Sequence, residues 1–206
     1  MTAKSVVRRG VIAHEYDDRL FQDCACQRGA KADTTCRECR HYRPTCAACF
    51  AATHRSNPLH WAYQWSEGNR CLVRHDISAI DKDFAHIVGH RGELCPFASE
   101  PYLFTITSCN GIHGTRLRFC ECVGGPTHLE QLLDARMCPS TIKDPKSAFD
   151  FDVLKLHDLL LMKCHASTIS YIEVLRRLTD GAFTFDVPVS PSTRYQRYQS
   201  VLTPMP

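Results

Sequence analysis

The chain has 206 residues, of which 13 are cysteines and 11 are histidines, and its formal net charge at pH 7 is +3. Apolar residues make up 44% and charged residues 23%, a balance that predicts a folded chain and excludes a disordered one. No apolar run reaches the roughly 18–20 residues that cross a bilayer, and the N-terminus lacks the apolar stretch of a signal peptide. We therefore expect an intracellular protein that is neither membrane-bound nor secreted.

The cysteine count indicates metal ions rather than disulfides. Disulfide frameworks typically have even counts in short secreted domains, whereas this chain is long, has an odd count and carries no export signal. Thiolates at short spacing with histidines nearby are what Zn²⁺ requires, because four ligands must converge within about 2.0–2.3 Å of one ion. Residues 1–20 form a polar lead-in. Closely spaced cysteines and histidines follow in a cluster over residues 21–66.

The ligand order in that cluster is C-x-C-x9-C-x2-C-x6-C-x2-C-x4-H-x5-H, which is enough for two closed tetrahedral Zn²⁺ sites. The eight candidate ligands are Cys24, Cys26, Cys36, Cys39, Cys46, Cys49, His54 and His60. An interleaved, cross-brace arrangement groups Cys24, Cys26, Cys46 and Cys49 on one ion and Cys36, Cys39, His54 and His60 on the other. A sequential arrangement instead groups the first four and the last four. We favour the cross-brace, although the spacing alone leaves both open.

An aromatic segment follows the cluster directly. Trp61, Tyr63 and Trp65 alternate with other residues, and this period of two predicts a strand. We favour an ordinary buried strand face for these rings over an aromatic ligand-binding surface.

Residues 67–125 are expected to contain strands and a hairpin. The β-rich runs Tyr102–Ser108 and His113–Phe119 flank Asn110-Gly111, a pair that accepts positive φ and favours a tight turn. Such a hairpin would return the end of its second strand to the segment before its first. A third Zn²⁺ site is then conceivable from His90, Cys95, Cys120 and Cys122, with His86 and His113 as competitors for the histidine position.

Residues 126–206 change in character and predict a helical subdomain. Thr127 and Glu130 form a capping-box pattern, residues 149–162 are helical with an apolar stripe, and Ser167 or Thr168 can cap the next helix. Gly181 would follow its end, and Ser190-Pro191 could start a third helix. The stripe of the first of the two long helices is expected to consist of Leu156, Leu159 and Leu160, and that of the second of Ile169, Ile172, Leu175 and Leu178. We expect Cys71, Cys109, Cys138 and Cys164 to be buried free thiols.

Charge and motifs bear on the partner. Residues 1–60 hold 10 Lys and Arg against 6 Asp and Glu, and the chain has 18 Arg against 7 Lys, a bias that favours phosphate or carboxylate contacts. Nine zinc-bound thiolates and three Zn²⁺ ions would, however, bring the net charge from +3 to zero (3 − 9 + 6). No phosphate-binding loop, nucleophile elbow or H-E-x-x-H motif is present, so we identify no catalytic residue and no small-molecule substrate.

The ordered set of motifs resembles the CxC-type cysteine-cluster domain that accompanies Kyakuja–Dileera–Zisupton (KDZ) transposases of fungi, over roughly residues 24–200. The residues that carry the resemblance are the cysteine knuckles, His54 to His60, Trp65, Val88-Gly89-His90, Cys95-Pro96, Asn110 to His113, Arg118 to Cys122, Glu130 to Leu133, Cys138 to Thr141, Phe149 to Leu160 and Leu175 to Asp180. Met162-Lys-Cys164-His165 departs from the family, which usually has a turn with Gly or Ser there.

The resemblance implies a zinc-binding module that precedes a transposase catalytic domain, and it supports the third site. No catalytic domain is expected in this chain, which ends at Pro206. The first cluster also resembles a B-box in its ligand order. We therefore expect an α+β fold with a zinc-stabilised, B-box-like N-terminal lobe, a hairpin region and a helical subdomain. The expected function is non-catalytic DNA binding in the nucleus, with protein–protein interaction as the alternative.

Overall fold

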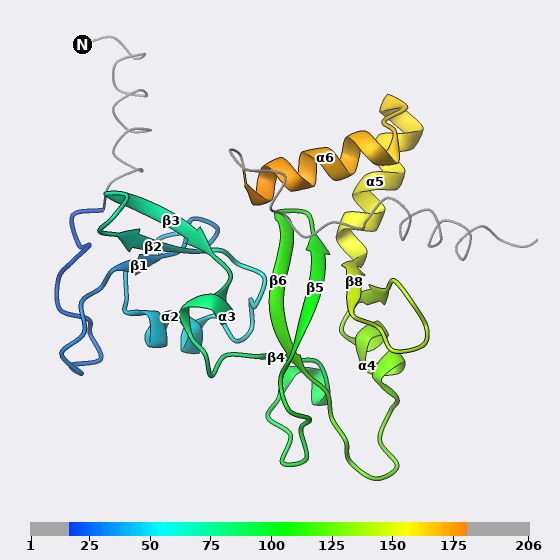
Figure 1. Ribbon diagram of the computed structural model, residues 1–206, viewed down its shortest axis with the longest axis horizontal. Coiled ribbons are helices and arrows are strands. Elements are labelled where there is room, and N and C mark those ends of the chain that lie inside the picture. The colour runs from blue at the N-terminus through cyan, green and yellow to red at the C-terminus, as the bar shows by residue number, and fades with distance from the viewer. Residues whose placement is uncertain (1–16, 181–206) are drawn as a thin grey trace, which may run out of the picture. The chain divides into compact units, whose positions relative to one another are not determined.

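The computed structural model describes residues 17–180 (Figure 1). The chain divides into two compact units, Met1–Lys82 and Asp83–Pro206. Helices and strands occur in both, so the expected α+β class is confirmed. Most of the expected lead-in, Gly181 and the expected helix from Ser190 lie outside the described residues.

The first unit contains a small antiparallel sheet in the order β1-β2-β3. Its described elements are β1 (Thr34–Thr35), α2 (Ala47–Thr53), β2 (Ala62–Ser66), β3 (Cys71–His75) and α3 (Ile77–Ile80). β2 confirms the strand that the alternating aromatic residues predicted. Asp76 ends β3 and caps α3, because its carboxylate accepts a hydrogen bond from the Ser78 backbone N–H.

The second unit is built on a mixed five-stranded sheet in the order β4-β6-β5-β8-β7. Its strands are β4 (His86–Ile87), β5 (Tyr102–Ser108), β6 (Gly111–Arg118), β7 (Met137–Pro139) and β8 (Ser147–Asp150). A 3₁₀ turn, η1 (His90–Gly92), and the helices α4 (His128–Asp134), α5 (Phe151–Cys164) and α6 (Thr168–Thr179) complete the described part of this unit. Within it, β5 pairs antiparallel with β6 and parallel with β8.

The predicted hairpin is confirmed, but its turn lies one residue earlier than expected. Ser108 pairs with Gly111, so Cys109 and Asn110 form the two-residue loop. Gly111, with φ of 138°, is the first residue of β6 and not the centre of the turn. The positive φ that the Asn-Gly pair suggested is therefore used at the glycine alone, where a side chain would be strained.

Local signals placed the helix starts well, with one exception. The capping box of Thr127 and Glu130 is present, and the Ser167 side chain caps α6. The prediction that the preceding helix begins at Phe149 is wrong, because Phe149 belongs to β8 and Asp150 caps α5. At the other end of α5, His165 takes a left-handed conformation with φ of 52°, which makes the turn where the resembled family has Gly or Ser.

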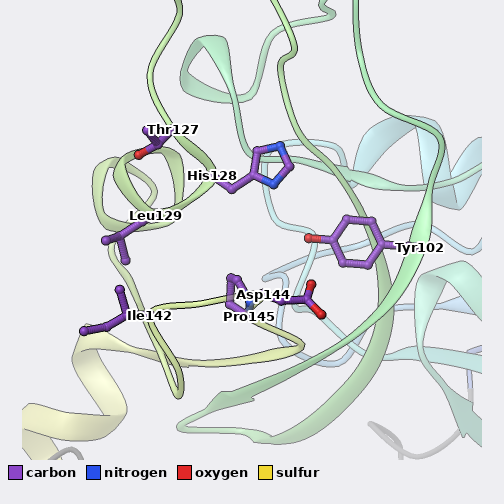
Figure 2. A pocket seen from close by; sticks show the side chains of 7 residues that line it. All are labelled: Tyr102, Thr127, His128, Leu129, Ile142, Asp144 and Pro145. Carbon is purple, nitrogen blue, oxygen red and sulfur yellow. The ribbon is translucent and has the colours of Figure 1, made fainter.

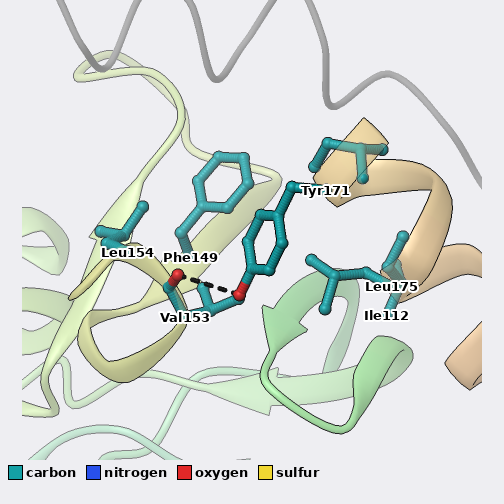
Figure 3. Close-up of a cluster of buried hydrophobic side chains, with 7 residues drawn as sticks. Ile112, Phe149, Val153, Leu154, Tyr171 and Leu175 are labelled. Atoms are coloured by element: carbon teal, nitrogen blue, oxygen red, sulfur yellow. Dashed lines mark hydrogen bonds between the residues drawn. The ribbon is translucent and has the colours of Figure 1, made fainter. Parts of the chain in front are cut away.

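The core of the second unit lies where α5 and α6 pack on the sheet, and α6 crosses the turn end of the β5–β6 hairpin (Figure 1). Figure 3 shows Tyr171 reaching from α6 toward the start of α5, where its hydroxyl donates to the Val153 carbonyl at 3.2 Å. The buried cluster consists of Ile112, Phe149, Val153, Leu154, Tyr171, Ile172 and Leu175. This bond and the surrounding apolar contacts fix the crossing of the two helices.

The predicted apolar stripe of α5 is wrong for Leu156 and Leu159, whereas Leu160 is partly buried against the core as expected. Leu156 and Leu159 are 39% and 45% exposed, whereas Val153, Leu154 and His157 are buried. Apolar residues surround most of this helix, so their period did not select one face. In α6, Ile172 and Leu175 are buried as expected, but Ile169 and Leu178 are exposed.

This core provides a matched pair of substitutions on one helix. Leu175→Ala should lower the free energy of unfolding by about 2–5 kcal/mol, since Leu175 is 1% exposed and its removal leaves a cavity. Leu178→Ala, at a position 43% exposed, should cost less than about 1 kcal/mol. Urea unfolding of the metal-loaded protein, followed by far-UV circular dichroism, measures both. Equal losses would contradict the assignment of this core.

Candidate metal centres

Within residues 17–180, three groups of cysteine and histidine side chains converge. In each group four ligand atoms lie within 4.8 Å of one another. The groups are Cys24, Cys26, Cys46 and Cys49; Cys36, Cys39, His54 and His60; and His90, Cys95, Cys120 and Cys122. Each group can hold a metal ion. The three groups contain all twelve residues that the sequence predicted as ligands.

The first group joins a loop to the start of α2. Cys24 and Cys26 lie in the loop closed by the Asp23–Lys31 bridge, and Cys46 is the N-cap residue of α2. The Sγ atoms of Cys26 and Cys46 are 3.9 Å apart, and the Cys46 backbone N–H donates to Cys24 Sγ at 3.3 Å. A tetrahedral Zn²⁺ with Zn–S bonds of about 2.3 Å separates its sulfur ligands by about 3.8 Å. Cys26 and Cys46 therefore have the spacing of two sulfur ligands on such an ion.

The second group joins the Cys36–Cys39 knuckle to the far end of α2. Cys39 Sγ lies 3.5 Å from His54 Nε2 and 3.3 Å from His60 Nδ1, and Cys36 Sγ lies 3.6 Å from His60 Nδ1. His54 is the C-cap residue of α2 and is 1% exposed. Its Nδ1–H donates to the Phe50 carbonyl at 2.9 Å, which leaves Nε2 facing the sulfur. This second bond orients the ring as metal-binding histidines require.

The convergence of these eight side chains is interleaved along the sequence. The cysteine pairs at 24–26 and 46–49 meet in one group, whereas the pair at 36–39 meets the two histidines. Helix α2 supplies Cys49 to the first group, and its C-cap residue His54 belongs to the second. The side chains are therefore arranged as the favoured cross-brace has them and not in the sequential grouping.

The third group depends on the hairpin of the second unit. The segment after Cys95 runs back along the end of β6, where Ser99 N–H donates to Phe119 O and Glu121 N–H donates to Phe97 O. Cys95 Sγ then lies 3.6 Å from Cys122 Sγ, and His90 Nε2 lies 3.1 Å from Cys120 Sγ. The predicted return of Cys120 to the segment before Tyr102 is therefore present.

Two residues that belong to the motifs of the resemblance, but to which the sequence assigned no role, support this group. Gln131 on α4 is 2% exposed, and its amide accepts from the Cys120 backbone N–H at 2.8 Å and donates to the Cys120 carbonyl at 2.9 Å. A Cβ placed on Gly89 would lie 2.5 Å from Cys120 Cβ and 2.8 Å from Gln131 Oε1. Only glycine allows this approach. Neither residue lies at a recognisable short spacing from the cysteines, so the sequence did not indicate that it contacts Cys120.

The thiols in these groups differ in acidity. Backbone N–H groups of Cys26 and Cys46 lower the pKa of Cys24 to about 6, and the Cys122 N–H lowers the pKa of Cys120 to about 7. The neighbouring Cys120 thiol raises the pKa of Cys122 to about 12. A first thiolate is therefore favoured and a second beside it is opposed, and a bound cation reverses that opposition.

The remaining cysteines and the competing histidines lie outside the three groups. His113 is fully buried with Nε2 2.9 Å from Asn110 Oδ1, and neither His113 nor His86 joins the third group. The expectation that the other four cysteines are buried is wrong. Cys71 and Cys164 are exposed, and Cys109 and Cys138 are half-buried.

An open pocket in the second unit is distinct from the metal-binding groups. Figure 2 shows the rings of Tyr102 and His128 and the carboxylate of Asp144 around it. The His128 ring stacks on Phe119 with centroids 4.1 Å apart, which gives it a packing role. Burial and the charge of Asp144 raise the pKa of Tyr102 to about 12, so its hydroxyl stays protonated at neutral pH. We assign no chemistry to this pocket.

One protein family matches part of the second unit. Residues 84–182 are similar to the family described as a CxC2-like cysteine cluster associated with KDZ transposases. The match is shorter than the stretch from 24 to 200 that the motifs suggested, and it contains the third group but not the first two. The family is a cysteine-cluster module and not itself a catalytic domain. Neither a curated protein nor a solved structure matches the chain.

The role of Gly89 can be tested against a second glycine. Gly89→Ala should disrupt the third group, because the added methyl would overlap Cys120 and Gln131. Gly114→Ala is the control, since a Cβ there meets nothing within 4 Å. We expect Gly89→Ala to lose one metal ion per chain by elemental analysis and Gly114→Ala to lose none. Full metal content in Gly89→Ala would show that this close approach is dispensable.

Proposed function

We propose that the chain is a non-catalytic module that binds three Zn²⁺ ions and contacts DNA. The observation that carries the proposal is the convergence of three four-ligand groups made of thiol and imidazole side chains. Tetrahedral sets of sulfur and nitrogen ligands are typical of Zn²⁺ or iron–sulfur centres, and the Cys₂His₂ and Cys₃His sets favour zinc.

Four protein ligands make each proposed site closed. A bound Zn²⁺ would supply folding free energy and would have no open position for an activated water. Neighbouring residues hold the ligand side chains in place. The Phe50 carbonyl orients His54, and the Gln131 amide fixes the backbone of Cys120. The proposed role of the metal ions is therefore structural.

DNA is the proposed partner because of the family and the charge of the first unit. The family accompanies transposases, which act on DNA ends. Residues 1–60 carry an excess of four basic residues (10 against 6), and most of these are arginines, which suit phosphate contacts. A nuclear location follows from this proposal. No helix within residues 17–180 is long and apolar enough to span a bilayer.

A protein-binding role is the second candidate. The interleaved ligand order of the first unit resembles that of B-box domains, and zinc loading would bring the net charge near zero. A B-box-like lobe would bind another protein chain without touching DNA.

Metal stoichiometry tests the structural part of the proposal. We expect three zinc ions per chain, and two in the Cys120→Ser, Cys122→Ser double variant, because the first two groups share no residue with the third. A Cys71→Ser, Cys164→Ser double variant should retain three, since both of these cysteines are exposed and lie outside the groups. Elemental analysis together with thiol titration measures the result. Two zinc ions in the unmutated protein would eliminate the third site.

A salt titration separates the two candidate functions. Binding of the zinc-loaded chain to a labelled DNA duplex should weaken steeply as salt rises, because phosphate contacts release counterions. The slope of log K against log salt gives the number of contacts. Absence of binding at about 50 mM salt would eliminate the DNA proposal and leave the protein-binding alternative.

A further inference from the structure

The loops that carry the third group expose large apolar side chains. Leu94 is 77% exposed and Phe97 is 65% exposed, and Val123 is fully exposed. Single exposed apolar residues are ordinary on a protein surface, whereas a cluster of them marks an interaction site. We call these three residues the apolar rim.

The rim residues flank two ligands that converge. Cys95 lies between the first two of them in the sequence, and Cys122 directly precedes the third. The Sγ atoms of these cysteines are 3.6 Å apart. The Glu121 backbone N–H donates to the Phe97 carbonyl at 2.9 Å, so the two loops are paired beside the rim. The three apolar side chains therefore share one small part of the surface, at the end of the hairpin opposite to α6 (Figure 1).

The surroundings of the rim are acidic. With histidines neutral, residues 88–100 and 118–134 contain two basic residues, Arg91 and Arg118, against five acidic ones, a net charge of −3 (2 − 5). The acidic residues are Glu93, Glu100, Glu121, Glu130 and Asp134. Three thiolates with one Zn²⁺ would add a further negative charge (2 − 3). The charge around the rim is therefore negative.

The carboxylates nearest the rim keep their charge. Within residues 17–180, no Lys, Arg or His side chain forms an ion pair with Glu93, Glu121 or Asp134. Hydrogen bonds from the backbone N–H and the hydroxyl of Thr127 lower the pKa of Glu130, so this carboxylate is ionised at neutral pH. These groups are available to a cation from outside the chain.

An open hollow lies between the metal-binding loops and α4. It has a volume of about 350 Å³. Glu130 and Asp134, which lie four residues apart on one face of α4, line it together with His90 and Pro126 of the two loops. A Lys or Arg side chain that entered this hollow would meet two carboxylates.

We propose that the apolar rim and this acidic hollow bind a segment of a partner protein that carries apolar side chains next to lysine or arginine. The apolar side chains of the partner pack on the rim, and a basic side chain enters the hollow toward Glu130 and Asp134. The surface lies in the second unit and is separate from the DNA contacts proposed for the first. The inference rests on the proposed third metal site, because that site orders the loops.

The chemistry of the surface selects this partner over others. Nucleic acids and anionic membranes carry negative charge, which an acidic surface repels. A symmetric contact between two copies of the chain would place the same acidic groups opposite one another. A basic segment without apolar side chains would leave the rim exposed to water.

Peptides of defined composition test the proposal. The probe is a labelled peptide with four repeats of Lys-Leu-Ser, and its controls have four repeats of Lys-Ser-Ser or of Glu-Leu-Ser. Fluorescence anisotropy with the zinc-loaded full chain measures each affinity. We expect the Lys-Leu-Ser peptide to bind about tenfold more tightly than either control, because it alone matches both the rim and the carboxylates.

Two variants, each with a matched control, locate the surface. Phe97→Ser should weaken binding of the Lys-Leu-Ser peptide by about tenfold, because aromatic anchors dominate such contacts. Its control is Ile169→Ser, since Ile169 on α6 is 67% exposed. Asp134→Asn should weaken binding by about threefold, as expected for an exposed charge pair. Its control is Glu67→Gln, which changes an exposed carboxylate of the first unit.

Metal content separates loss of binding from loss of the metal site. Elemental analysis should find three zinc ions in each variant. Asp134→Asn still tests the surface if Phe97→Ser loses an ion, because α4 supplies no ligand. Three zinc ions without peptide binding would overturn the inference and leave the proposed function intact. Two zinc ions in the unmutated protein would remove the third site and this inference together.

The remaining outcomes name the partner. Tighter binding of the Lys-Leu-Ser peptide, reduced in Phe97→Ser and Asp134→Asn but not in their controls, supports the inference. Equal binding of the Lys-Ser-Ser peptide overturns it, since the rim is then unused. Binding to phosphatidylcholine–phosphatidylserine vesicles that Phe97→Ser abolishes would overturn it in favour of a membrane. Self-association abolished by the same substitution would overturn it in favour of a second copy of the chain.

Discussion

The convergence of ligand side chains from distant loops is the constraint on which both units depend. The first unit buries few large apolar side chains, chiefly Leu20, Phe50, Trp61 and Ile77, and its strands and helices are short. So small a core leaves much of the ordering entropy of the loops uncompensated. In the second unit the sheet and two helices form a larger core, yet the loop from His90 to Cys95 has no buried apolar side chain of its own. Thiol and imidazole groups supply the contacts that apolar residues do not.

The sequence predicted those features that depend on local chemistry. Knuckle spacing pointed to the eight side chains that converge in the first two groups, the alternating rings identified β2, and the Thr127–Glu130 pair identified the start of α4. In each case the residues that form the feature lie within a few positions of one another. Their pattern can therefore be recognised in a single sequence. The hairpin could be predicted for the same reason. Its return of Cys120 toward Cys95 then predicted the convergence of the third group.

Features that depend on residues far apart in the sequence could not be predicted from it. β8 begins a segment whose pattern also suits a helix, and its pairing with β5 on one side and β7 on the other makes residues 147–150 a strand. The faces of α5 were equally apolar, and the Tyr171 contact with Val153 decides which of them is buried. Gly89 and Gln131 support Cys120 from positions that share no motif with it. Long-range packing, and not composition, settles all of these.

The position of α2 has a consequence for how metal ions would enter the first unit. One end of this seven-residue helix lies in the first group and the other end in the second. An ion bound at either end would order the helix and so prepare the opposite end for its own ion, which lowers the entropy lost in the second event. By linkage the effect would be reciprocal, so two ions would bind with positive cooperativity. Singly loaded chains would then be scarce at any zinc concentration, and the lobe would respond to zinc as a switch with a steep threshold.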